Sequence, residues 1–263
     1  MGQFNPDFYR LYRPFYPVEA FTGLREGLLA QGLSEPFLLC DVGCGTGHSS
    51  VSVLRAGIDA RIIGIDPDSG MLMHARELSQ IQGFGERIEF REGMGEETGL
   101  SHFSVDGILV GSAFHWMDPL LARDEFSRIL KPCGLIHIFE YQFPKAVHLK
   151  ELNEWIRRQF NLHWKAPGQV PRGDFSRVTS GFREDPRFKK RAEGRPPMVL
   201  VLGADELSGL LLSQSRVLHF ESTLQGSEKQ DFRSALRTEI RGRLGPEGAA
   251  FDFRLAWVSF SKR

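Results

Sequence analysis

The stretch that decides the fold is FLLCDVGCGTG, which occupies residues 37–47. Its first residues form a short apolar run that ends in an acid, as a buried strand does. Three glycines then follow within five positions, Gly43, Gly45 and Gly47, and glycine permits left-handed backbone and close approach of a ligand. A helical pattern comes next, over 49–55, and stops at Gly57. The stretch therefore predicts a strand, a glycine turn and a helix.

The same alternation of strands and helices continues along the first 143 residues. We expect helices over 18–28, 72–78 and 119–130, and strands over 61–66, 88–90, 105–110 and 135–143. Asp118 before Pro119 is typical of a helix start, because aspartate caps the free amides and proline suits the first helical position. Such alternation predicts a mostly parallel sheet covered by helices, with ligands bound at the carboxyl ends of its strands.

Length and charge predict one elaborated domain. A chain of 263 residues is long for one fold and short for two. Between residues 144 and 197 there are 13 Lys and Arg against 6 Asp and Glu. We interpret the whole chain, 1–263, as a single domain with an N-terminal arm (1–17), a cofactor-binding core (18–143), a substrate-side insertion (144–197) and a C-terminal part that completes the sheet (198–263). The last part is expected to contain strands at 198–202 and 251–260 and helices at 204–214 and 227–243.

Composition excludes several classes of protein. The 33 basic and 33 acidic residues cancel, so no overall field attracts a nucleic acid or a membrane surface. The longest aliphatic run, 198–202, is far shorter than the roughly 20 residues of a membrane span. Three cysteines without a CxxC pair and eight histidines without zinc spacing indicate reduced thiols and no metal. We expect a cytoplasmic protein that binds neither membrane nor nucleic acid; the sequence gives no oligomeric state.

The glycine turn and two acids indicate the class of cofactor. In a dinucleotide fingerprint the third glycine would stand at His48, whereas here it is Gly47. Asp41 would also lie beside a pyrophosphate, where two anions repel. Asp66 ends the next strand, 21 residues after Gly45, where a carboxylate can accept both ribose hydroxyls. Together the two acids favour a positively charged cofactor that carries adenosine, and NAD fits them poorly.

With these residues the sequence resembles a known family. DVGCGTG at 41–47 and GIDP at 64–67 resemble motif I and the following acidic loop of class I S-adenosylmethionine-dependent methyltransferases. The resemblance extends over roughly residues 5–143, and its further motifs are similar to the branch of trans-aconitate methyltransferase-like proteins: YRLYRPFYP at 9–17, EGMGEETGL at 92–100, SVD at 104–106, AFHWMD at 113–118 and KPCG at 131–134. It implies an α/β, Rossmann-like fold with a mostly parallel seven-stranded sheet, helices on both faces and an insertion over the carboxyl ends of the strands. The cofactor would be S-adenosyl-L-methionine, and the product S-adenosyl-L-homocysteine.

The resemblance also implies which residues surround the methionine and ribose of that cofactor. The methionine part would be held by Asp41, Gly43, Cys44 and Gly45, and the ribose by Asp66. Tyr9 and Arg13 in the arm would close over the cofactor, with Arg13 as a partner for its carboxylate. The alternative for this arm is simple packing on the sheet.

Around the adenine the sequence departs from the family pattern. Pro67 and Met71 would border the ring. Many class I enzymes place an acid directly after the glycine that follows strand three, where this chain has Met94. Recognition would then fall to the backbone of Met94 and Gly95 or to the carboxylate of Glu96.

Other positions bear on the acceptor. Ser112 and Ala113 would flank the sulfonium. His115 is a candidate general base or hydrogen-bond partner of the acceptor, or else only orients its loop, and Trp116 is a candidate pocket wall. A base is needed only for an acceptor that arrives protonated.

The basic segment offers a candidate clamp for a carboxylated or phosphorylated small molecule. Its members are Arg172, Arg177, Arg183 and Arg187. The alternative is an arginine-rich surface in solvent. The aromatic residues of the segment would either cap an apolar acceptor or form a small core of their own.

We therefore expect methyl transfer from S-adenosylmethionine to a small-molecule acceptor, with an oxygen acceptor such as a carboxylate favoured. The first alternative is a non-catalytic module that only binds the cofactor, because the same residues bind without doing chemistry. The second is an NAD-dependent oxidoreductase, against which Asp41 and His48 argue. A nucleic-acid or protein methyltransferase is a third.

Overall fold

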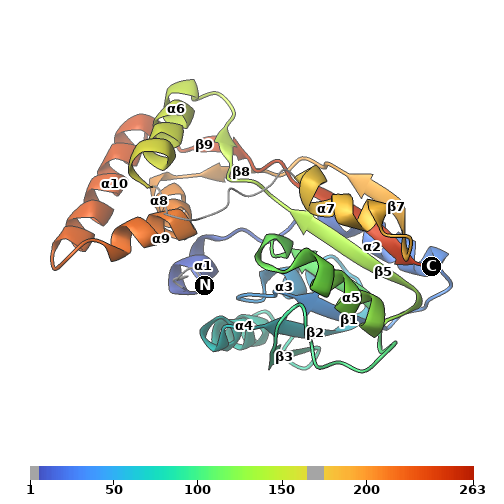
Figure 1. Cartoon of the computed structure of the whole chain (residues 1–263). Coiled ribbons are helices and arrows are strands. Elements are labelled where there is room, and N and C mark those ends of the chain that lie inside the picture. The colour runs from blue at the N-terminus through green and yellow to red at the C-terminus, as the bar shows by residue number, and fades with distance from the viewer. Residues whose placement is uncertain (1–5, 165–174) are drawn as a thin grey trace. The chain divides into compact units, whose positions relative to one another are not determined.

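The computed structural model describes residues 6–164 and 175–263 and contains two compact units (Figure 1). The larger unit is built from Phe15–Tyr141, Arg172–Pro196 and Leu255–Arg263, and the smaller one from Met1–Pro14, Gln142–Pro171 and Pro197–Arg254. Each unit is described here by itself, over its described residues.

A seven-stranded sheet forms the centre of the larger unit, with strand order β3-β2-β1-β4-β5-β10-β7. Its strands are β1 (Phe37–Val42), β2 (Ala60–Asp66), β3 (Ile88–Glu92), β4 (Val105–Gly111), β5 (Leu130–Glu140), β7 (Phe188–Gly194) and β10 (Ala256–Lys262). β10 runs antiparallel to β5 and β7, and the pairs among β1 to β5 are parallel. The predicted mostly parallel seven-stranded sheet is confirmed.

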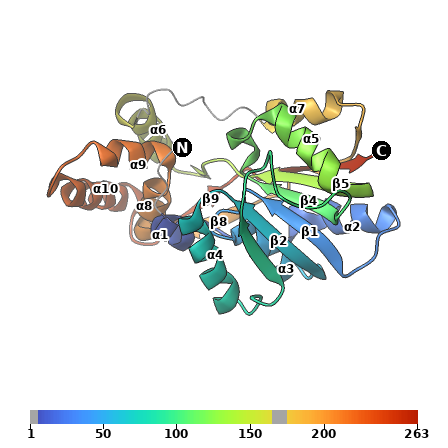
Figure 2. The ribbon, with the colours of Figure 1, turned by 60° about the horizontal axis from the view of Figure 1, so that its bottom comes forward.

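Helices cover both faces of this sheet (Figure 2). They are α2 (Thr22–Ala30), α3 (His48–Arg55), α4 (Ser69–Ile81), α5 (Pro119–Ile129) and α7 (Phe175–Glu184), with short 3₁₀ helices at Val18–Phe21 and Phe114–Trp116. Because successive side chains of a strand point to opposite faces of the sheet, β5 packs against the helices on both faces. Leu135 lies against Gly27 of α2, while Ile136 and Ile138 join the apolar cluster that contains Phe126 of α5 and Phe182 of α7.

Helix starts follow the capping chemistry that the sequence predicts. The Asp118 carboxylate accepts hydrogen bonds from Leu120 N and Leu121 N at 2.9 and 3.0 Å, with Pro119 in the first turn of α5. Asp68 does the same for the first turn of α4. These caps start both helices directly after segments that leave the carboxyl ends of strands.

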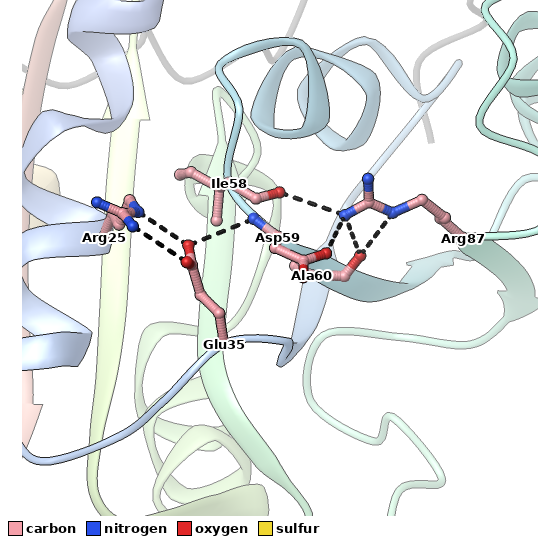
Figure 3. A network of polar contacts seen from close by, with 6 residues as sticks. All are labelled: Arg25, Glu35, Ile58, Asp59, Ala60 and Arg87. Carbon is pink, nitrogen blue, oxygen red and sulfur yellow. Dashed lines mark hydrogen bonds and ion pairs between the residues drawn. The ribbon is translucent and has the colours of Figure 1, made fainter.

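A polar network lies at the amino ends of β1 and β2 (Figure 3). This edge of the sheet is opposite the one formed by the carboxyl ends of the parallel strands. Arg25 of α2 donates two hydrogen bonds to Glu35, at 2.8 and 3.0 Å, and Glu35 also accepts from Asp59 N. Arg87, just before β3, donates to Asp59 and to the backbone of Ile58 and Ala60. Exposed pairs of this kind contribute little stability each, but here they join α2 to the starts of three neighbouring strands.

The smaller unit has a core of its own. It contains α1 (Pro6–Tyr12), α6 (Lys150–Arg158), a π-helical turn (Gln159–His163), α8 (Ala204–Leu212), α9 (Ser215–Ser222), α10 (Glu228–Leu244) and an antiparallel sheet β6-β9-β8 made of Lys145–Ala146, Ala249–Asp252 and Val199–Leu202. Trp164 is 2% exposed, and its ring packs edge-on against Trp155, Phe160 and Phe232. The aromatic residues of the predicted insertion that lie in this unit thus form a small core.

The boundaries differ from those expected for a single elaborated domain. The segment 144–197 is not one insertion, because its part up to residue 164 belongs to the smaller unit while α7 and β7 join the main sheet. Nor does 198–263 only complete that sheet, since β8 lies in the small sheet and only β10 enters the large one. The expected strand 251–260 is two strands, because Arg254 adopts φ 48° and its N–H donates to Asp252 Oδ1 in a turn. The apolar pattern of a strand does not specify its partner.

Residues 6–164 and 175–263 lack both long apolar helices and clusters of metal-ligating side chains. There, no helix is long and apolar enough to cross a membrane. Within the same ranges, no three His, Cys, Asp or Glu side chains gather in a way that could hold a metal ion. Cys40, Cys44 and Cys133 are free thiols.

His137 of β5 gives the first testable prediction. It is fully buried, with Nε2 2.7 Å from Ala20 O and Nδ1 2.8 Å from Ser259 Oγ, and burial lowers its pKa from 6.5 to about 4. The unfolded chain therefore binds this proton at a higher pH than the folded one, so stability is lost as pH falls from 6.5 towards 4. The loss amounts to about 3 kcal/mol.

We expect His137→Gln to flatten this part of the pH profile of the unfolding free energy, measured by urea denaturation. The exposed His102→Gln serves as control. An unchanged slope in His137→Gln would contradict the assignment.

Candidate functional site

The glycine turn between β1 and α3 is fixed to the neighbouring strand. Gly43 N and Cys44 N both donate to Ile65 O of β2, at 2.8 and 3.1 Å, and Gly47 N donates to Cys44 O at 2.9 Å. Gly43, Gly45 and Gly47 have φ of +70°, +53° and +81°, which L side chains rarely adopt. Backbone hydrogen bonds and left-handed glycines therefore define the shape of the loop.

The three glycines are required for different reasons. A Cβ at Gly43 would lie 2.5 Å from Ala113 Cβ, and one at Gly47 would lie 3.1 Å from Ala75 Cβ of α4. Gly43 and Gly47 thus permit close packing against the end of β4 and against α4. A Cβ at Gly45 would meet nothing within 4 Å. Gly45 leaves bare backbone beside open space, as a loop that receives a ligand does.

Asp41, at the end of β1, is a buried carboxylate of which one oxygen accepts hydrogen bonds. Its Oδ2 accepts hydrogen bonds from Ser49 Oγ and Ser50 Oγ, both at 2.5 Å, and the residue is 0% exposed. Its Oδ1 has no hydrogen-bond partner among the described residues. Burial raises the pKa of Asp41 to about 6, against the two serine hydrogen bonds that lower it. Buried polar atoms are normally paired, so Oδ1 calls for a donor or a cation from a ligand.

Asp66, at the end of β2, lies directly beside the open glycine. Its Oδ2 accepts from Gly45 N at 2.9 Å and its Oδ1 from Asp68 N at 3.0 Å. Burial raises the pKa of this carboxyl too. Met71, in the first turn of α4, is buried, and Pro67 is exposed. The structure therefore brings Asp41, residues 43–45 and Asp66 together at the carboxyl ends of β1 and β2.

The segment after β3, where the adenine was expected, is held from several directions. Gly93 N donates to Asp66 O at 3.2 Å, and a Cβ at Gly95 would lie 2.6 Å from Met117 Sδ. The Glu96 carboxylate accepts from Asp118 N at 2.6 Å. Because Glu96 is already engaged with the start of α5, the backbone of Met94 and Gly95 is the favoured one of the two alternatives. Adenine recognition there stays a prediction.

At the end of β4, Ser112 has a left-handed backbone with φ 54°. Its N–H donates to Phe139 O at 2.8 Å, and its Oγ accepts a 3.0 Å hydrogen bond from the Tyr16 hydroxyl. Tyr16 is 9% exposed and packs edge-on against Phe139 at 4.7 Å. Such backbone strain is often found at functional sites. Tyr16 was not among the predicted site residues, although its place in the RPFYP motif at 13–17 was a signal.

The short helix that follows presents two candidate acceptor residues. Phe114 is buried, and its ring centroid lies 5.2 Å from that of Phe182. His115 is half-buried and Trp116 is 52% exposed, with their rings 5.0 Å apart. Phe114 is the residue that anchors this helix, and Trp116 is not a core residue. The role of Trp116 as a pocket wall stays a prediction, and so does the role of His115 as a base or hydrogen-bond partner of the acceptor.

Four predicted site residues have no described side chain in the larger unit, which contains the glycine turn. Tyr9 and Arg13 belong to the smaller unit, where the Arg13 guanidinium lies 4.7 Å from the Tyr9 ring centroid and donates to Ser213 O. Arg172 lies outside the described residues, and Arg177 lies in α7 with its side chain outside them. Their roles stay predictions.

Two members of the expected arginine clamp have another role. Arg183 forms an ion pair with Glu193 at 2.7 Å, and Arg187 forms pairs with Asp185 and Asp124, each at 2.7 Å. The hydrogen bond from Arg187 holds the pKa of Asp185 below its usual range. These arginines neutralise acids of the same unit.

Arg187 also lies at the wrong edge of the sheet for a clamp. It precedes β7, whose first residue Phe188 pairs with Lys262 at the end of β10. Since β10 is antiparallel to β5, that end lies opposite the carboxyl ends of β1 and β4. The interpretation of Arg187 as a substrate ligand is wrong, because sequence alone did not show which edge it reaches. Arg183 is different, since its partner Glu193 is level with Val110 near the carboxyl end of β4. Its place in a clamp stays a prediction.

Comparisons with known proteins address the same region. Residues 40–138 match a family model described as a methyltransferase domain. An uncharacterized methyltransferase of Mycobacterium bovis is 32% identical over 152 residues, which cover 57% of this chain and 56% of that protein. A malonyl-[acyl-carrier protein] O-methyltransferase of a Methylovorus species is 35% identical over 133 residues, 49% of this chain and 43% of that protein. The chain thus spans about half the length of the curated relatives it matches.

A solved structure agrees with the fold. It is that of a candidate type II methyltransferase from Anaeromyxobacter dehalogenans, which matches with a TM-score of 0.64 and 22% identity over 95% of this chain and 97% of that one. At this identity the match shows the fold alone. The family match at 40–138 lies wholly in the larger unit and includes Asp41, Asp66 and Ser112.

Gly45 allows a direct test of the ligand loop. We expect Gly45→Ala to abolish binding of S-adenosylhomocysteine, measured by calorimetry, because the methyl group would occupy the open space beside the loop. Gly57→Ala is a matched control, since Gly57 also has a positive φ, +80°, and open space around its Cβ position. Both changes should cost about 1–2 kcal/mol of stability for left-handed backbone. Equal binding by the two variants would refute a ligand at Gly45.

Asp41→Asn should separate stability from binding. Because the folded pKa of about 6 exceeds the unfolded value of 3.8, Asp41 contributes stability below pH 3.8 that is lost as pH rises through 6. We expect Asp41→Asn to gain about 3 kcal/mol over the wild type between pH 4 and pH 8 in urea denaturation. The same variant should bind S-adenosylmethionine roughly ten- to a hundredfold more weakly at pH 8, through the loss of a charged hydrogen-bond partner. A variant that loses stability at pH 8 and keeps its affinity would contradict this assignment.

Proposed function

We propose that this chain is a class I S-adenosylmethionine-dependent methyltransferase, which transfers a methyl group from S-adenosylmethionine to a small-molecule acceptor and releases S-adenosylhomocysteine. The match of residues 40–138 to a methyltransferase domain supports the proposal. The observation that carries the proposal is the buried Asp41, whose Oδ1 has no partner in the described part of the chain. It lies at the same edge as the open backbone of Gly45 and the carboxylate of Asp66. An uncompensated buried carboxylate is costly, and a cationic cofactor would relieve that cost.

The residues present fit such a cofactor. Asp41 and residues 43–45 would hold its methionine part, Asp66 its ribose, and Pro67, Met71 and the backbone of residues 94–95 would border its adenine. When bound, it supplies a methyl group on a positively charged sulfur, which is a good leaving group. The chain's own residues then have to align the acceptor and exclude water. Ser112 and Ala113, at the end of β4, would flank the sulfonium of the cofactor.

We favour an oxygen acceptor, and a carboxylate in particular. A carboxylate is ionised at neutral pH, so in-line displacement requires alignment and no general base. His115 would then bind or orient the acceptor rather than take its proton. A relative named as a malonyl-[acyl-carrier protein] O-methyltransferase supports an oxygen acceptor. The resemblance to the trans-aconitate methyltransferase-like branch supports a carboxylate in the same way.

A non-catalytic module that binds the cofactor is the second candidate, because Asp41, Gly45 and Asp66 bind without chemistry. Turnover on any acceptor separates the two. An NAD-dependent oxidoreductase is disfavoured, since the buried Asp41 would face a pyrophosphate.

Incubation of the full chain with methyl-labelled S-adenosylmethionine and panels of carboxylates, phenols and amines tests the proposal. We expect label in a carboxylate, recovered as volatile methanol after alkali, as a methyl ester releases it. Label only in a phenol or an amine would overturn the acceptor class. No transfer to any acceptor, despite cofactor binding, would favour the binding module.

His115→Asn then tests the role of the histidine. With a carboxylate acceptor we expect kcat to fall less than about tenfold and its pH profile to keep its shape. Loss of a general base would instead cost about 10²–10⁴-fold.

A further inference from the structure

The first turn of α3 is built around Asp41. Ser49 and Ser50 are adjacent in sequence, 5% and 0% exposed, and both hydroxyls donate to the same oxygen, Asp41 Oδ2, at 2.5 Å. Hydroxyl-to-carboxylate bonds of this length are the strong, charge-assisted kind. The two serines occupy one oxygen completely and leave the other, Oδ1, without a partner among the described residues.

We propose that Ser49 and Ser50 are positioning residues that keep the buried Asp41 carboxylate ionised and hold its second oxygen ready for a positively charged cofactor. The claim that Oδ1 is held ready for a cofactor rests on the proposed function. The claim that the serines keep the carboxylate ionised rests on the geometry alone. Neither serine has to touch the cofactor or the acceptor in this role.

No other group in the described structure can do this work. Asp41 forms no ion pair among the described residues. The groups that act on its ionisation are burial, the two serine hydroxyls, Asp66 and the backbone of Ser50, which lowers the pKa least. Asp66 is an acid and opposes ionisation. The thiols of Cys40 and Cys44 also lie close enough to interact with Asp41, and burial raises the pKa of both, so they stay neutral. Without the two hydroxyls, Asp41 would be a buried anion that no side chain of the described residues stabilises.

The arrangement makes cofactor binding depend on pH. Burial raises the pKa of Asp41 and the serine bonds lower it, with a balance at about 6. A cationic ligand binds the ionised form, so affinity falls as pH drops through this value. Removal of one serine bond should raise the midpoint by about one pH unit, because a hydrogen bond to a charged group is worth about 1.5–3 kcal/mol and one unit equals 1.36 kcal/mol.

The test is the pH dependence of S-adenosylmethionine binding between pH 5 and 9, by calorimetry, for the wild type, Ser49→Ala and Ser50→Ala. Ser52→Ala is the matched control, because Ser52 lies in the same helix, is 1% exposed, and donates to His48 O rather than to Asp41. We expect the midpoint to rise by about one unit in the first two variants and to stay unchanged in Ser52→Ala. Near pH 9 the affinities should converge. An equal loss at every pH, or the same shift in Ser52→Ala, would overturn the proposal.

A second readout needs no ligand. The folded-state pKa of Asp41 exceeds the unfolded value, so stability falls as pH rises through it. In Ser50→Ala this fall should extend about one pH unit higher, and in an Asp41→Asn background Ser50→Ala should leave the pH profile of the unfolding free energy unchanged. A shift that persists in Asp41→Asn would contradict the role of the serine.

The two readouts distinguish the two proposals. If the stability profile shifts as expected but no variant binds S-adenosylmethionine at any pH, the proposed function fails and the ionisation role stands. If the wild type binds the cofactor and neither profile moves in the serine variants, the positioning role fails and the proposed function stands.

Discussion

The site depends on one constraint, a buried negative charge that has no counter-ion among residues 6–164 and 175–263. The end of β1 places Asp41 in the interior, 0% exposed, where an isolated carboxylate is costly. The fold reduces this cost on one side only, through the two hydroxyls of α3 that donate to Oδ2. The other oxygen lies at the edge of the sheet where Gly45 is open and Asp66 ends β2. Charge, open backbone and a second acid thus favour one kind of ligand, a cation that carries a ribose.

Much of the larger unit could be predicted from the sequence, because its signals are local. The glycine turn, the capping pair Asp118 and Pro119 and the alternating apolar runs each specify an element within a few residues. The assignment of later strands failed because pairing is non-local. Phe251 and Phe260 stand in one apolar stretch, yet the turn at Arg254 sends them into two sheets. Nothing in the alternation of side chains tells which partner a strand will choose.

The site residues also differ in whether local sequence signals or non-local packing determine their positions. Asp41, Gly43, Gly45 and Asp66 come together because parallel strands end at one edge. Local charge excess did not show that Arg183 and Arg187 pair with acids of their own unit, or that Arg187 lies at the opposite edge, before the start of β7. Tyr16 and the pair Ser49 and Ser50 were missed, since a hydroxyl that points inward cannot be told from an exposed one in sequence. Their contacts depend on the packing of β4, β5 and α3.

The central claim is that the edge formed by β1 and β2 binds a cationic adenosyl cofactor. The most direct measurement is calorimetric titration of S-adenosylmethionine, S-adenosylhomocysteine and NAD into the wild type, Asp66→Ala and Asp59→Ala. Asp59 is a matched control, because its exposed carboxylate lies in the network at the opposite edge (Figure 3). We expect both adenosyl-sulfur ligands to bind the wild type and Asp59→Ala, to lose binding in Asp66→Ala, and NAD to give no heat. Binding of NAD alone, or unchanged affinity in Asp66→Ala, would contradict the claim.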